Sequence, residues 1–451
     1  MNVLERESTL HQAERFVWHH GVQDATYFER NHRILRSGKG VHVEDLDGRT
    51  YIDGTSGQAV VLIGHGREEM ADAIAEQVRT IAFAPLAFGF SHPYAAALAQ
   101  QLAEITPGSL ERTFFACSGS EANDTAIKIA RQAQARRGEA TRKKIIARRG
   151  SYHGVTYGAL SATATTRLRE PSEPLVGGFR HIAQPYPTTC AFCQNEGTCT
   201  LACADDLQRC IEFEGPSTVA AFIAEPIATP EAIKVPAPGY WERIADICRG
   251  YGVFLIADEV FVGFGRTGRL FASEHFGFEP EIMTMSKGLT SGYVPLSAAI
   301  ATREIAALFD SPEHAFQHAG TYSGHPVACA AAMKNIEIIH EEGLIENARR
   351  QGERLESRLG QLAGLPFVRA VTVIGLLIGV ELTAAGGHAT PSVVGPFIRD
   401  RAFENGLICR YVGPSICLYP PLILSDAESD QLADILLEAF DAAAGRFGGK
   451  A

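Results

Sequence analysis

The sequence predicts an α/β protein with a large domain, built on a mainly parallel sheet between helices, and a smaller α+β lobe formed by both chain ends. From about residue 76 to 330, apolar runs of strand length alternate with stretches of helical periodicity. This alternation is typical of a parallel sheet covered on both faces. An Asp-Gly turn near the start indicates a hairpin, and the tail after residue 330 is again rich in strand patterns.

The small lobe is expected to combine the N-terminal hairpin with the C-terminal tail. Residues 41–46 and 50–52 have strand patterns and flank Asp47-Gly48, the strongest short signal for a two-residue hairpin turn. The tail has a long helical pattern and then three strand patterns, at 326–362, 371–382, 407–410 and 416–419. We therefore predict an N-terminal segment of the small lobe, a large domain and a C-terminal small domain, at 1–75, 76–330 and 331–451.

Two apolar runs in the large domain end in chemically useful side chains. Val253–Ala257 leads into Asp258, and Ile282–Met285 leads through Ser286 into Lys287. Ligands of open parallel sheets bind at the carboxyl ends of the strands, so Asp258 and Lys287 can face one small molecule. Pyridoxal phosphate requires this pair, because its aldehyde takes a lysine amine and a carboxylate raises the pKa of its ring nitrogen. The alternative is a surface lysine and a strand-end salt bridge.

Three further strand ends add to this pattern. The run 112–117 is followed by small residues and a helical pattern, so the free amides of Gly119 and Ser120 at a helix start can bind a phosphate. After the run 143–147, the ring of Tyr152 can lie on a pyridine face. The run Val219–Ala224 ends in Glu225.

Taken together, these segments resemble the class III pyridoxal-phosphate-dependent aminotransferases of fold type I. The resemblance covers nearly the whole chain and rests on an ordered set of motifs rather than on any one of them. In chain order the set is Ser118–Asn123, Tyr152-His153-Gly154, Glu225-Pro226, Asp258-Glu259-Val260 with Gly263–Gly268, Ser286–Leu289 and the loop around Thr321.

The resemblance implies a catalytic role for two residues and ring contacts for three more. Lys287 is expected to form the Schiff base with pyridoxal phosphate and to move the proton, while Asp258 pairs with the ring nitrogen. Val260 and Tyr152 are expected to enclose the ring. Glu225 is expected to support either Asp258 or the surroundings of the cofactor's 3-hydroxyl group.

The remaining cofactor contacts implied by the resemblance come from two subunits. Ser118, Gly119, Ser120 and His153 belong to the binding set of one subunit, with Gly119 and Ser120 on the phosphate. Thr321 is expected to reach that phosphate from the partner subunit. The resemblance therefore implies a homodimer, or a dimer of dimers, with shared active sites.

Departures from related subgroups bear on the substrate. Relatives that act on 2-oxoglutarate with 4-aminobutyrate or ornithine carry a glutamate where this chain has Pro230, and dialkylglycine decarboxylases carry an arginine where it has Cys417. Arg410 instead matches the mobile arginine of omega-aminotransferases that use pyruvate. Gln58 resembles the decarboxylase pattern, and Ala59 replaces a bulky tryptophan, which predicts a roomier pocket. The expected substrate-binding residues are Arg410, Gln58, Phe88 and Tyr152.

The predicted activity is transfer of an amino group from a primary amine or omega-amino acid to a 2-oxo acid, with pyruvate as the expected acceptor, by a ping-pong mechanism. A decarboxylating transaminase or an amino-acid racemase on the same fold is the alternative. A non-catalytic protein that binds pyridoxal phosphate is a more distant one, disfavoured by the intact Lys287, Asp258 and Thr321.

Composition excludes other classes of function. The net charge is -11 and no basic stripe is present, which argues against nucleic-acid binding. No apolar run has the length of a membrane span, and the start of the chain lacks a signal-peptide layout. We therefore predict a cytoplasmic protein.

Five of the ten cysteines lie between Cys190 and Cys210. One interpretation is a structural zinc site or a disulfide-stapled insertion, and the other is a set of reduced thiols. The spacing matches no standard zinc pair of CxxC units, so the sequence favours reduced thiols. We also predict no metal at the active site.

Overall fold

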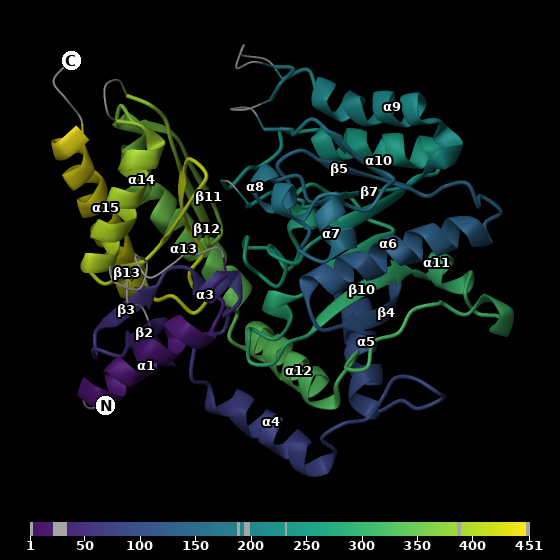
Figure 1. The fold of residues 1–451 in the computed structure, drawn as a ribbon, viewed down its shortest axis with the longest axis horizontal. Coiled ribbons are helices and arrows are strands. Elements are labelled where there is room, and N and C mark those ends of the chain that lie inside the picture. Colours follow the sequence, from purple (N-terminus) through teal and green to yellow (C-terminus); the bar gives the residue numbers. More distant parts are fainter. Residues whose placement is uncertain are drawn as a thin grey trace.

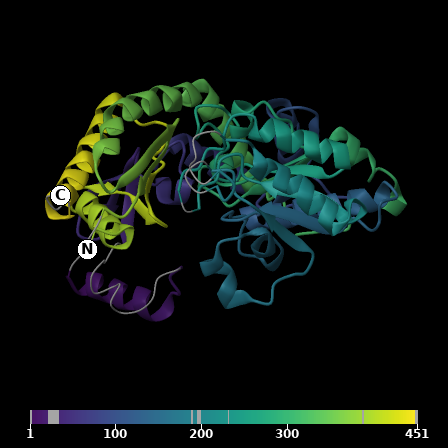
Figure 2. The ribbon, with the colours of Figure 1, turned by 90° about the horizontal axis from the view of Figure 1, so that it is seen from above.

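The computed structural model describes residues 3–20, 34–186, 190–193, 199–230, 232–385 and 389–447. The described residues form a seven-stranded sheet and two four-stranded sheets with helices around them. Figures 1 and 2 both place the purple N-terminal and yellow C-terminal elements together, beside the teal body that contains the large sheet. The α/β fold class predicted from the sequence is confirmed.

The large sheet has the strand order β4-β10-β9-β8-β7-β5-β6. Strands β6, β5, β7, β8 and β9 run parallel, whereas β10 is antiparallel to both of its neighbours, β9 and β4. The sheet is therefore mainly parallel, as predicted. Its strands are β4 (Leu110–Ala116), β5 (Lys144–Arg148), β6 (Phe179–Ile182), β7 (Val219–Ala224), β8 (Phe254–Asp258), β9 (Ile282–Met285) and β10 (Ser297–Thr302).

Helices cover both faces of this sheet because successive strand residues point to opposite sides. Ile145 packs in a core with residues of helix α6 (Gly119–Arg136), whereas the next residue, Ile146, packs in a separate core with helices α9 (Ala202–Glu214) and α10 (Tyr240–Tyr251). Figure 1 shows α9 and α10 on one side of β5 and β7, and α6 and α7 (Tyr157–Ala162) on the other. This arrangement explains why the strands are nearly continuous apolar runs.

The first small sheet joins the two ends of the chain. The predicted hairpin is confirmed, because β2 (His42–Asp45) and β3 (Thr50–Asp53) pair antiparallel around Asp47-Gly48. Strand β3 also pairs in parallel with β13 (Leu407–Ile408), and β1 (Leu35–Lys39) completes the sheet beside β2. The boundaries at residues 75 and 330 stay a prediction.

The second small sheet has the order β11-β12-β15-β14. The strand pattern at 371–382 folds as two strands, because Gly375, with φ of +54°, turns the chain between them. The pattern at 407–410 is divided between the two small sheets. The strands of the second sheet are β11 (Val368–Ile374), β12 (Leu377–Leu382), β14 (Arg410–Val412) and β15 (Ser415–Leu418).

The long helical pattern at 326–362 is two helices rather than one. Gly343, with φ of +61°, separates α12 (Pro326–Glu341) from α13 (Leu344–Leu359). Helices α14 (Pro391–Glu404) and α15 (Asp426–Phe447) complete the small lobe, and the sequence patterns did not predict them.

The other helices are α1 (Val3–Phe16), α3 (Ser56–Ala59), α4 (Glu68–Thr80), α5 (Pro93–Ile105), α7 (Tyr157–Ala162), α8 (Thr166–Arg169) and α11 (Arg303–Ala307), with 3-10 turns at Glu170–Ser172, Pro216–Thr218, Ala272–His275, Lys287–Leu289, Pro312–His314 and Gly360–Gly364. Within the described ranges, none of the helices has the length and apolar character needed to cross a membrane.

Candidate active site

Four predicted site residues lie at one edge of the large sheet. Strands β5, β7, β8 and β9 are neighbours and parallel, so their carboxyl ends meet at the same edge. Tyr152 follows β5, Glu225 follows β7, Asp258 ends β8 and Lys287 follows β9. The alternative of an isolated surface lysine and a strand-end salt bridge does not fit this geometry, because Asp258 is buried and Lys287 is half-buried.

The side chain of Lys287 has the properties of a nucleophile. Its backbone has φ of +41°, a strained conformation that clusters at functional sites. Its Nζ atom lies 4.4 Å from the centroid of the Phe261 ring. Burial lowers the pKa of Lys287 to about 8; the charge of Arg410 also lowers it, while Asp258 and Glu225 oppose the shift. Near neutral pH a useful fraction of the amine is therefore unprotonated.

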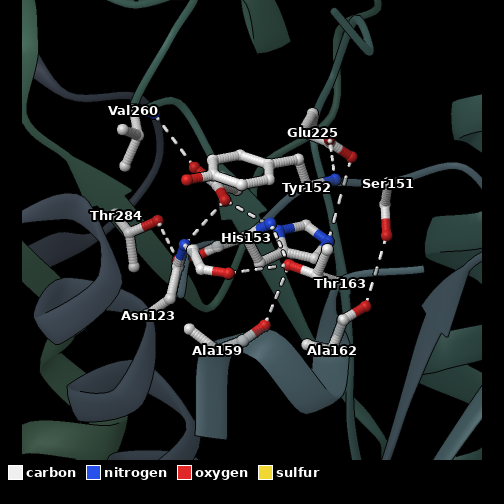
Figure 3. A network of polar contacts seen from close by, with 12 residues as sticks. Asn123, Ser151, Tyr152, His153, Ala159, Ala162, Thr163, Glu225, Val260 and Thr284 are labelled. Atoms are coloured by element: carbon white, nitrogen blue, oxygen red, sulfur yellow. Dashed lines mark hydrogen bonds and ion pairs between the residues drawn. The ribbon is translucent and has the colours of Figure 1, made fainter. Parts of the chain in front are cut away.

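The carboxylate of Asp258 is held by three hydrogen bonds (Figure 3). Its Oδ2 accepts from Asn123 Nδ2 at 2.8 Å and is 2.7 Å from His153 Nδ1. Its Oδ1 accepts from the backbone amide of Val260 at 3.1 Å. These contacts fix the buried Asp258 carboxylate in one orientation. A carboxylate that pairs with a protonated ring nitrogen needs such a fixed orientation.

Asn123 is a residue of this network to which the sequence analysis gave no role. Its Nδ2 also donates to the carbonyl of His153 at 2.7 Å, and its Oδ1 accepts from the hydroxyl of Thr284 at 2.7 Å. Asn123 is 1% exposed, among the alanines and isoleucines on the core face of α6. An amide side chain within the mainly apolar, buried face of this helix was the signal that could have identified it.

The start of helix α6 leaves amides free for an anion. Ser118 is the N-cap: its hydroxyl accepts from the amide of Glu121 at 3.3 Å, and the Glu121 carboxylate accepts from the amide of Ser118 at 3.1 Å. The side chain of Ser118 is thus engaged as a cap, whereas the amides of Gly119 and Ser120 lie at the positive end of the helix dipole.

Close packing surrounds these two amides. A Cβ atom on Gly119 would lie 2.7 Å from Cγ1 of Val260, and one on Gly154 would lie 2.4 Å from Oγ of Ser120. The Ser120 hydroxyl accepts from the amide of Val155 at 3.1 Å. The glycines allow the helix start, Val260 and the chain after Tyr152 to approach closely, so the residues present fit a phosphorylated pyridine.

Glu225 orients the segment that carries Tyr152. Its Oε1 accepts from the backbone amide of Tyr152 at 2.9 Å, and its Oε2 lies 3.8 Å from Nε2 of His153. Burial and the charge of Asp258 raise the pKa of Tyr152, and Arg410 opposes this shift. The ring of Tyr152 therefore offers an uncharged face at neutral pH.

Arg410 is joined to Lys287 by a chain of side-chain contacts. Its Nη1 donates to the hydroxyl of Tyr419 at 3.3 Å. The Tyr419 ring packs edge-on against Phe261 with centroids 5.1 Å apart, and Phe261 contacts Lys287. Arg410 and Pro230 also line a pocket of about 650 Å3, together with Arg149 and Gly150.

Three other predicted residues are exposed in the single chain. Gln58 lies in the irregular helix α3, and Thr321 lies in a turn before α12. Phe88 has 96% of its surface exposed. No hydrogen bond or ring contact found in the described parts of the chain joins these three to Lys287 or Asp258.

The cysteine segment is partly described. None of the ten cysteines is joined in a disulfide in this structure, and the sulfur atoms of Cys193 and Cys199 are 3.9 Å apart. Among the described residues, no group of three or more His, Cys, Asp or Glu side chains is arranged to hold a metal ion. The choice between reduced thiols and a metal or disulfide site stays a prediction.

This strand-edge site defines a pyridoxal-phosphate enzyme of the α/β type, and the comparisons with known proteins agree. The family model for class III aminotransferases matches residues 26–440. The chain therefore belongs to the class III aminotransferase family, whose members are transaminases that depend on pyridoxal phosphate.

Individual relatives support the same assignment. The chain is 38% identical over 450 residues to an uncharacterised aminotransferase, YhxA, of Bacillus subtilis, with 97% of this chain and 98% of the relative covered. It is 36% identical to the putrescine–pyruvate aminotransferase of Pseudomonas aeruginosa, with 92% and 91% covered.

Two solved structures are similar to this chain over nearly its whole length. An (S)-enantioselective omega-transaminase from Thermomicrobium roseum matches with a TM-score of 0.92 and 38% identity, covering 97% of this chain and 98% of the other. The omega-transaminase from Pseudomonas jessenii in complex with PMP matches with a TM-score of 0.92 and 33% identity, covering 98% and 99%.

Proposed function

We propose that this transaminase moves an amino group from a primary amine or omega-amino acid to a small 2-oxo acid, with pyruvate as the acceptor, in two separate half-reactions. The observation that carries the proposal is the meeting of Lys287 and the bonded carboxylate of Asp258 at one edge of the large sheet, with a chain of contacts from Lys287 to Arg410 on β14. When bound, pyridoxal phosphate supplies an electron sink next to the carbon that loses its proton.

Lys287 and Asp258 are assigned the proton chemistry. Lys287, with its lowered pKa, takes a proton from the substrate carbon and returns it at another position. Asp258 holds a proton on the ring nitrogen, because a fixed carboxylate stabilises the protonated form. The hydrogen bond from Asn123 and the contact with His153 keep this carboxylate aligned.

The binding of the cofactor is assigned to the residues around these two. The amides of Gly119 and Ser120 receive the phosphate, since a helix start favours a dianion. Val260 and Tyr152 enclose the ring, an arrangement supported by the close approach of Val260 to Gly119. Thr321 of a second copy completes the phosphate contacts.

Arg410 is assigned the carboxylate of the oxo acid. A guanidinium binds a carboxylate through a two-bond fork, and Arg410 lies against Tyr419 at the end of the contact chain from Lys287. Pro230 and Cys417 occupy the positions of the standard anchors in other subgroups, which leaves Arg410 as the matched cation. The named activities of the putrescine–pyruvate relative and of a taurine–pyruvate relative from Rhodobacter capsulatus are consistent with pyruvate.

A homodimer is the assembly that we propose. The segment 78–90 exposes a set of large apolar side chains, and Phe83 in it packs against the ring of Tyr322 with centroids 6.1 Å apart. Tyr322 follows Thr321 directly, so the turn predicted to reach a partner's site adjoins an apolar surface of the kind that proteins cover. A two-fold contact through this surface creates two equivalent sites.

The test is spectroscopic and separates the half-reactions. Purified holoenzyme is mixed with a panel of amines and omega-amino acids, and the change of the cofactor absorbance is recorded; pyruvate or 2-oxoglutarate is then added to the converted enzyme. We expect conversion by amines and recovery by pyruvate. Carbon dioxide release from a dialkyl amino acid would support the decarboxylating alternative, loss of chirality without net transfer would support a racemase, and no conversion by any amine would refute the proposal.

A further inference from the structure

Arg148 is a buried arginine that the roles given above do not explain. It is the last residue of β5, and its side chain is 0% exposed. The guanidinium lies over the rings of Trp241 and Tyr186, at 5.4 and 5.9 Å from their centroids. A charge removed from water is costly unless it is paired and hydrogen-bonded, so its partner indicates what it does.

That partner is Glu225, through both its main chain and its side chain. Nη2 of Arg148 donates to the carbonyl oxygen of Glu225 and lies 3.3 Å from its carboxylate Oε2. Strands β5 and β7 are parallel neighbours, so their ends bring the two residues together. One guanidinium group thus fixes the backbone and the carboxylate of Glu225 at once.

Glu225 in turn contacts the two residues after β5 that belong to the cofactor site. Its Oε1 receives the amide of Tyr152 at 2.9 Å, and its Oε2 lies 3.8 Å from Nε2 of His153. The other ring nitrogen of His153 is 2.7 Å from Asp258. Figure 3 shows Glu225, Tyr152 and His153 close together. These contacts therefore lead from Arg148 through Glu225 and the Tyr152-His153 segment to the Asp258 carboxylate.

The four side chains of this chain of contacts, those of Arg148, Glu225, His153 and Asp258, are all buried. His153 lies between two carboxylates, those of Glu225 and Asp258, and Arg148 is ion-paired with Glu225. Without Arg148, two anions would flank His153 with no buried cation bonded to Glu225. Such like charges repel strongly when they are desolvated.

We propose that Arg148 is a positioning residue for the cofactor: by holding Glu225 it fixes the backbone at Tyr152 and His153, and through this segment the ring contact of Tyr152 and the place of His153 beside the Asp258 carboxylate. The proposal rests on the roles proposed above for Tyr152 and Asp258. It does not depend on which amine or oxo acid the enzyme uses.

Arg266 provides a matched control. It is also 0% exposed, and it donates to the carbonyl oxygens of Leu376 and Pro420. None of its hydrogen bonds to the described residues involves Glu225, Tyr152 or His153. If the loss of any buried arginine were enough to disturb the cofactor, replacing Arg148 or Arg266 would change the Kd for pyridoxal phosphate and the circular dichroism equally.

The experiment compares Arg148→Gln, Arg148→Lys and Arg266→Gln. For each variant, one measures the Kd of the apoprotein for pyridoxal phosphate, the visible circular dichroism of the bound cofactor, kcat and KM, and the Tm. We expect Arg148→Gln to weaken cofactor binding by roughly tenfold to a hundredfold, the range of a lost charge-assisted hydrogen bond. Its dichroism band should change, and kcat should fall more than KM rises.

The controls decide between positioning and simple stabilisation. Arg148→Lys, which keeps the charge, should recover most of the binding and the dichroism band, and Arg266→Gln should lower Tm without changing either. An unchanged Kd and dichroism in Arg148→Gln, or equal changes in Arg266→Gln, would overturn the proposal. If Arg148→Gln does not fold, Glu225→Ala replaces it and must show the same two changes. Because binding and dichroism need no substrate, they also separate failure of this proposal from failure of the proposed activity.

Discussion

At the scale of single residues, Lys287 shows how the fold prepares a nucleophile. Its position directly after β9 places it beside Asp258, which ends the neighbouring strand, and its amine lies on the ring of Phe261. Burial and the charge of Arg410 destabilise the ammonium form of Lys287, while the carboxylates of Asp258 and Glu225 stabilise it. The net result favours the neutral amine at a lower pH than for a lysine in water.

This balance predicts the pH dependence of cofactor loading. Since burial lowers the pKa of Lys287 to about 8, the amine is protonated below that pH and reactive above it. The rate at which apoprotein is loaded with pyridoxal phosphate should therefore rise with pH, with a midpoint near 8. Arg410→Ala should move the midpoint upward, because a cation that disfavours the ammonium is removed. A midpoint near the ordinary lysine value of 10.5 in the unmodified chain would contradict the assignment.

Arg410 should affect one half-reaction more than the other. In Arg410→Ala, the oxo acid loses a fork of charge-assisted hydrogen bonds worth about 1.5 to 3 kcal/mol, so the step with pyruvate should slow by roughly one to two powers of ten. Conversion by a simple amine, which has no carboxylate, should suffer less. The two steps are followed separately by stopped-flow absorbance. Equal losses would mark Arg410 as structural, and an unchanged pyruvate step would direct attention to Gln58.

At the scale of elements, helix α6 serves the site with two consecutive turns. Its first turn offers the amides of Gly119 and Ser120, and its second turn directs Asn123 to Asp258. The capping box of Ser118 and Glu121 fixes where the helix begins. A shift of this start by one residue would misplace both the amides and the Asn123 side chain.

Asn123→Ala tests the second of these contributions. The change leaves the buried Asp258 carboxylate and Thr284 hydroxyl each without one hydrogen-bond partner, which should lower the free energy of unfolding by about 1 to 3 kcal/mol. The value of kcat should fall as well, because the Asp258 carboxylate is less well aligned. Gln134→Ala is the control, because Gln134 lies on the same helix and its buried amide binds the carbonyls of Ala220 and Gly252. Both changes should lower the free energy of unfolding. If kcat falls equally in both, Asn123 has no specific role at the site.

Helices α13 and α15 are joined by a row of ion pairs. Asp430 on α15 accepts from Arg354 at 2.5 Å and from Arg358 at 2.9 Å. The hydrogen bond from Arg354 is the main cause that lowers the pKa of Asp430 from 3.8 to about 2. Because the folded pKa is the lower one, the pair stabilises the fold above pH 4 and this contribution disappears as pH falls toward 2.

The expected result is a pH-dependent effect of Asp430→Asn. The variant should have a lower Tm than the unmodified chain at pH 7, and the difference should shrink as the pH is lowered below 4. Asp441→Asn is the control, since Asp441 lies on the same helix and forms no ion pair with a described residue. The difference at pH 7 should also shrink at high salt, because exposed pairs are screened. A Tm difference that is independent of both pH and salt would contradict an electrostatic origin.

At the scale of the whole molecule, the sequence predicts the strands and turns that are determined by local residue patterns. The strands that lead to Glu225, Asp258 and Lys287 are mainly apolar runs, and the Asp47-Gly48 hairpin has a two-residue turn signal, so each can be located in the sequence within a few residues. Contacts across the chain are not readable in this way. Asn123 and Asp258 are 135 positions apart, and their contact depends on the order of strands in the sheet.

The same limit applies to the site as a whole. The antiparallel direction of β10 and the division of 407–410 between two sheets depend on pairing partners rather than on periodicity. Gln58, Phe88 and Thr321 were predicted from a resemblance, and they are exposed in the single chain. Their roles depend on a second copy or on the substrate, neither of which a pattern in one chain specifies.

Shared active sites can be tested by mixing two inactive or weakened chains. In a heterodimer of Lys287→Ala and Thr321→Ala, one site combines the intact Lys287 of the second chain with the intact Thr321 of the first. The other site lacks both residues. Random exchange should therefore restore about a quarter of the unmodified activity, since half of the dimers are mixed and each has one intact site of two.

The control for this experiment replaces the first chain with the double variant Lys287→Ala/Thr321→Ala, which offers no intact Thr321 to the partner's site. Subunit exchange is verified by native mass spectrometry of tagged chains, and the residual activity of Thr321→Ala alone is subtracted. Recovery only in the first mixture would establish that Thr321 acts across the interface. Equal activity in both mixtures after verified exchange would place each complete site within one chain, and the exposed apolar surface of 78–90 would then need another explanation.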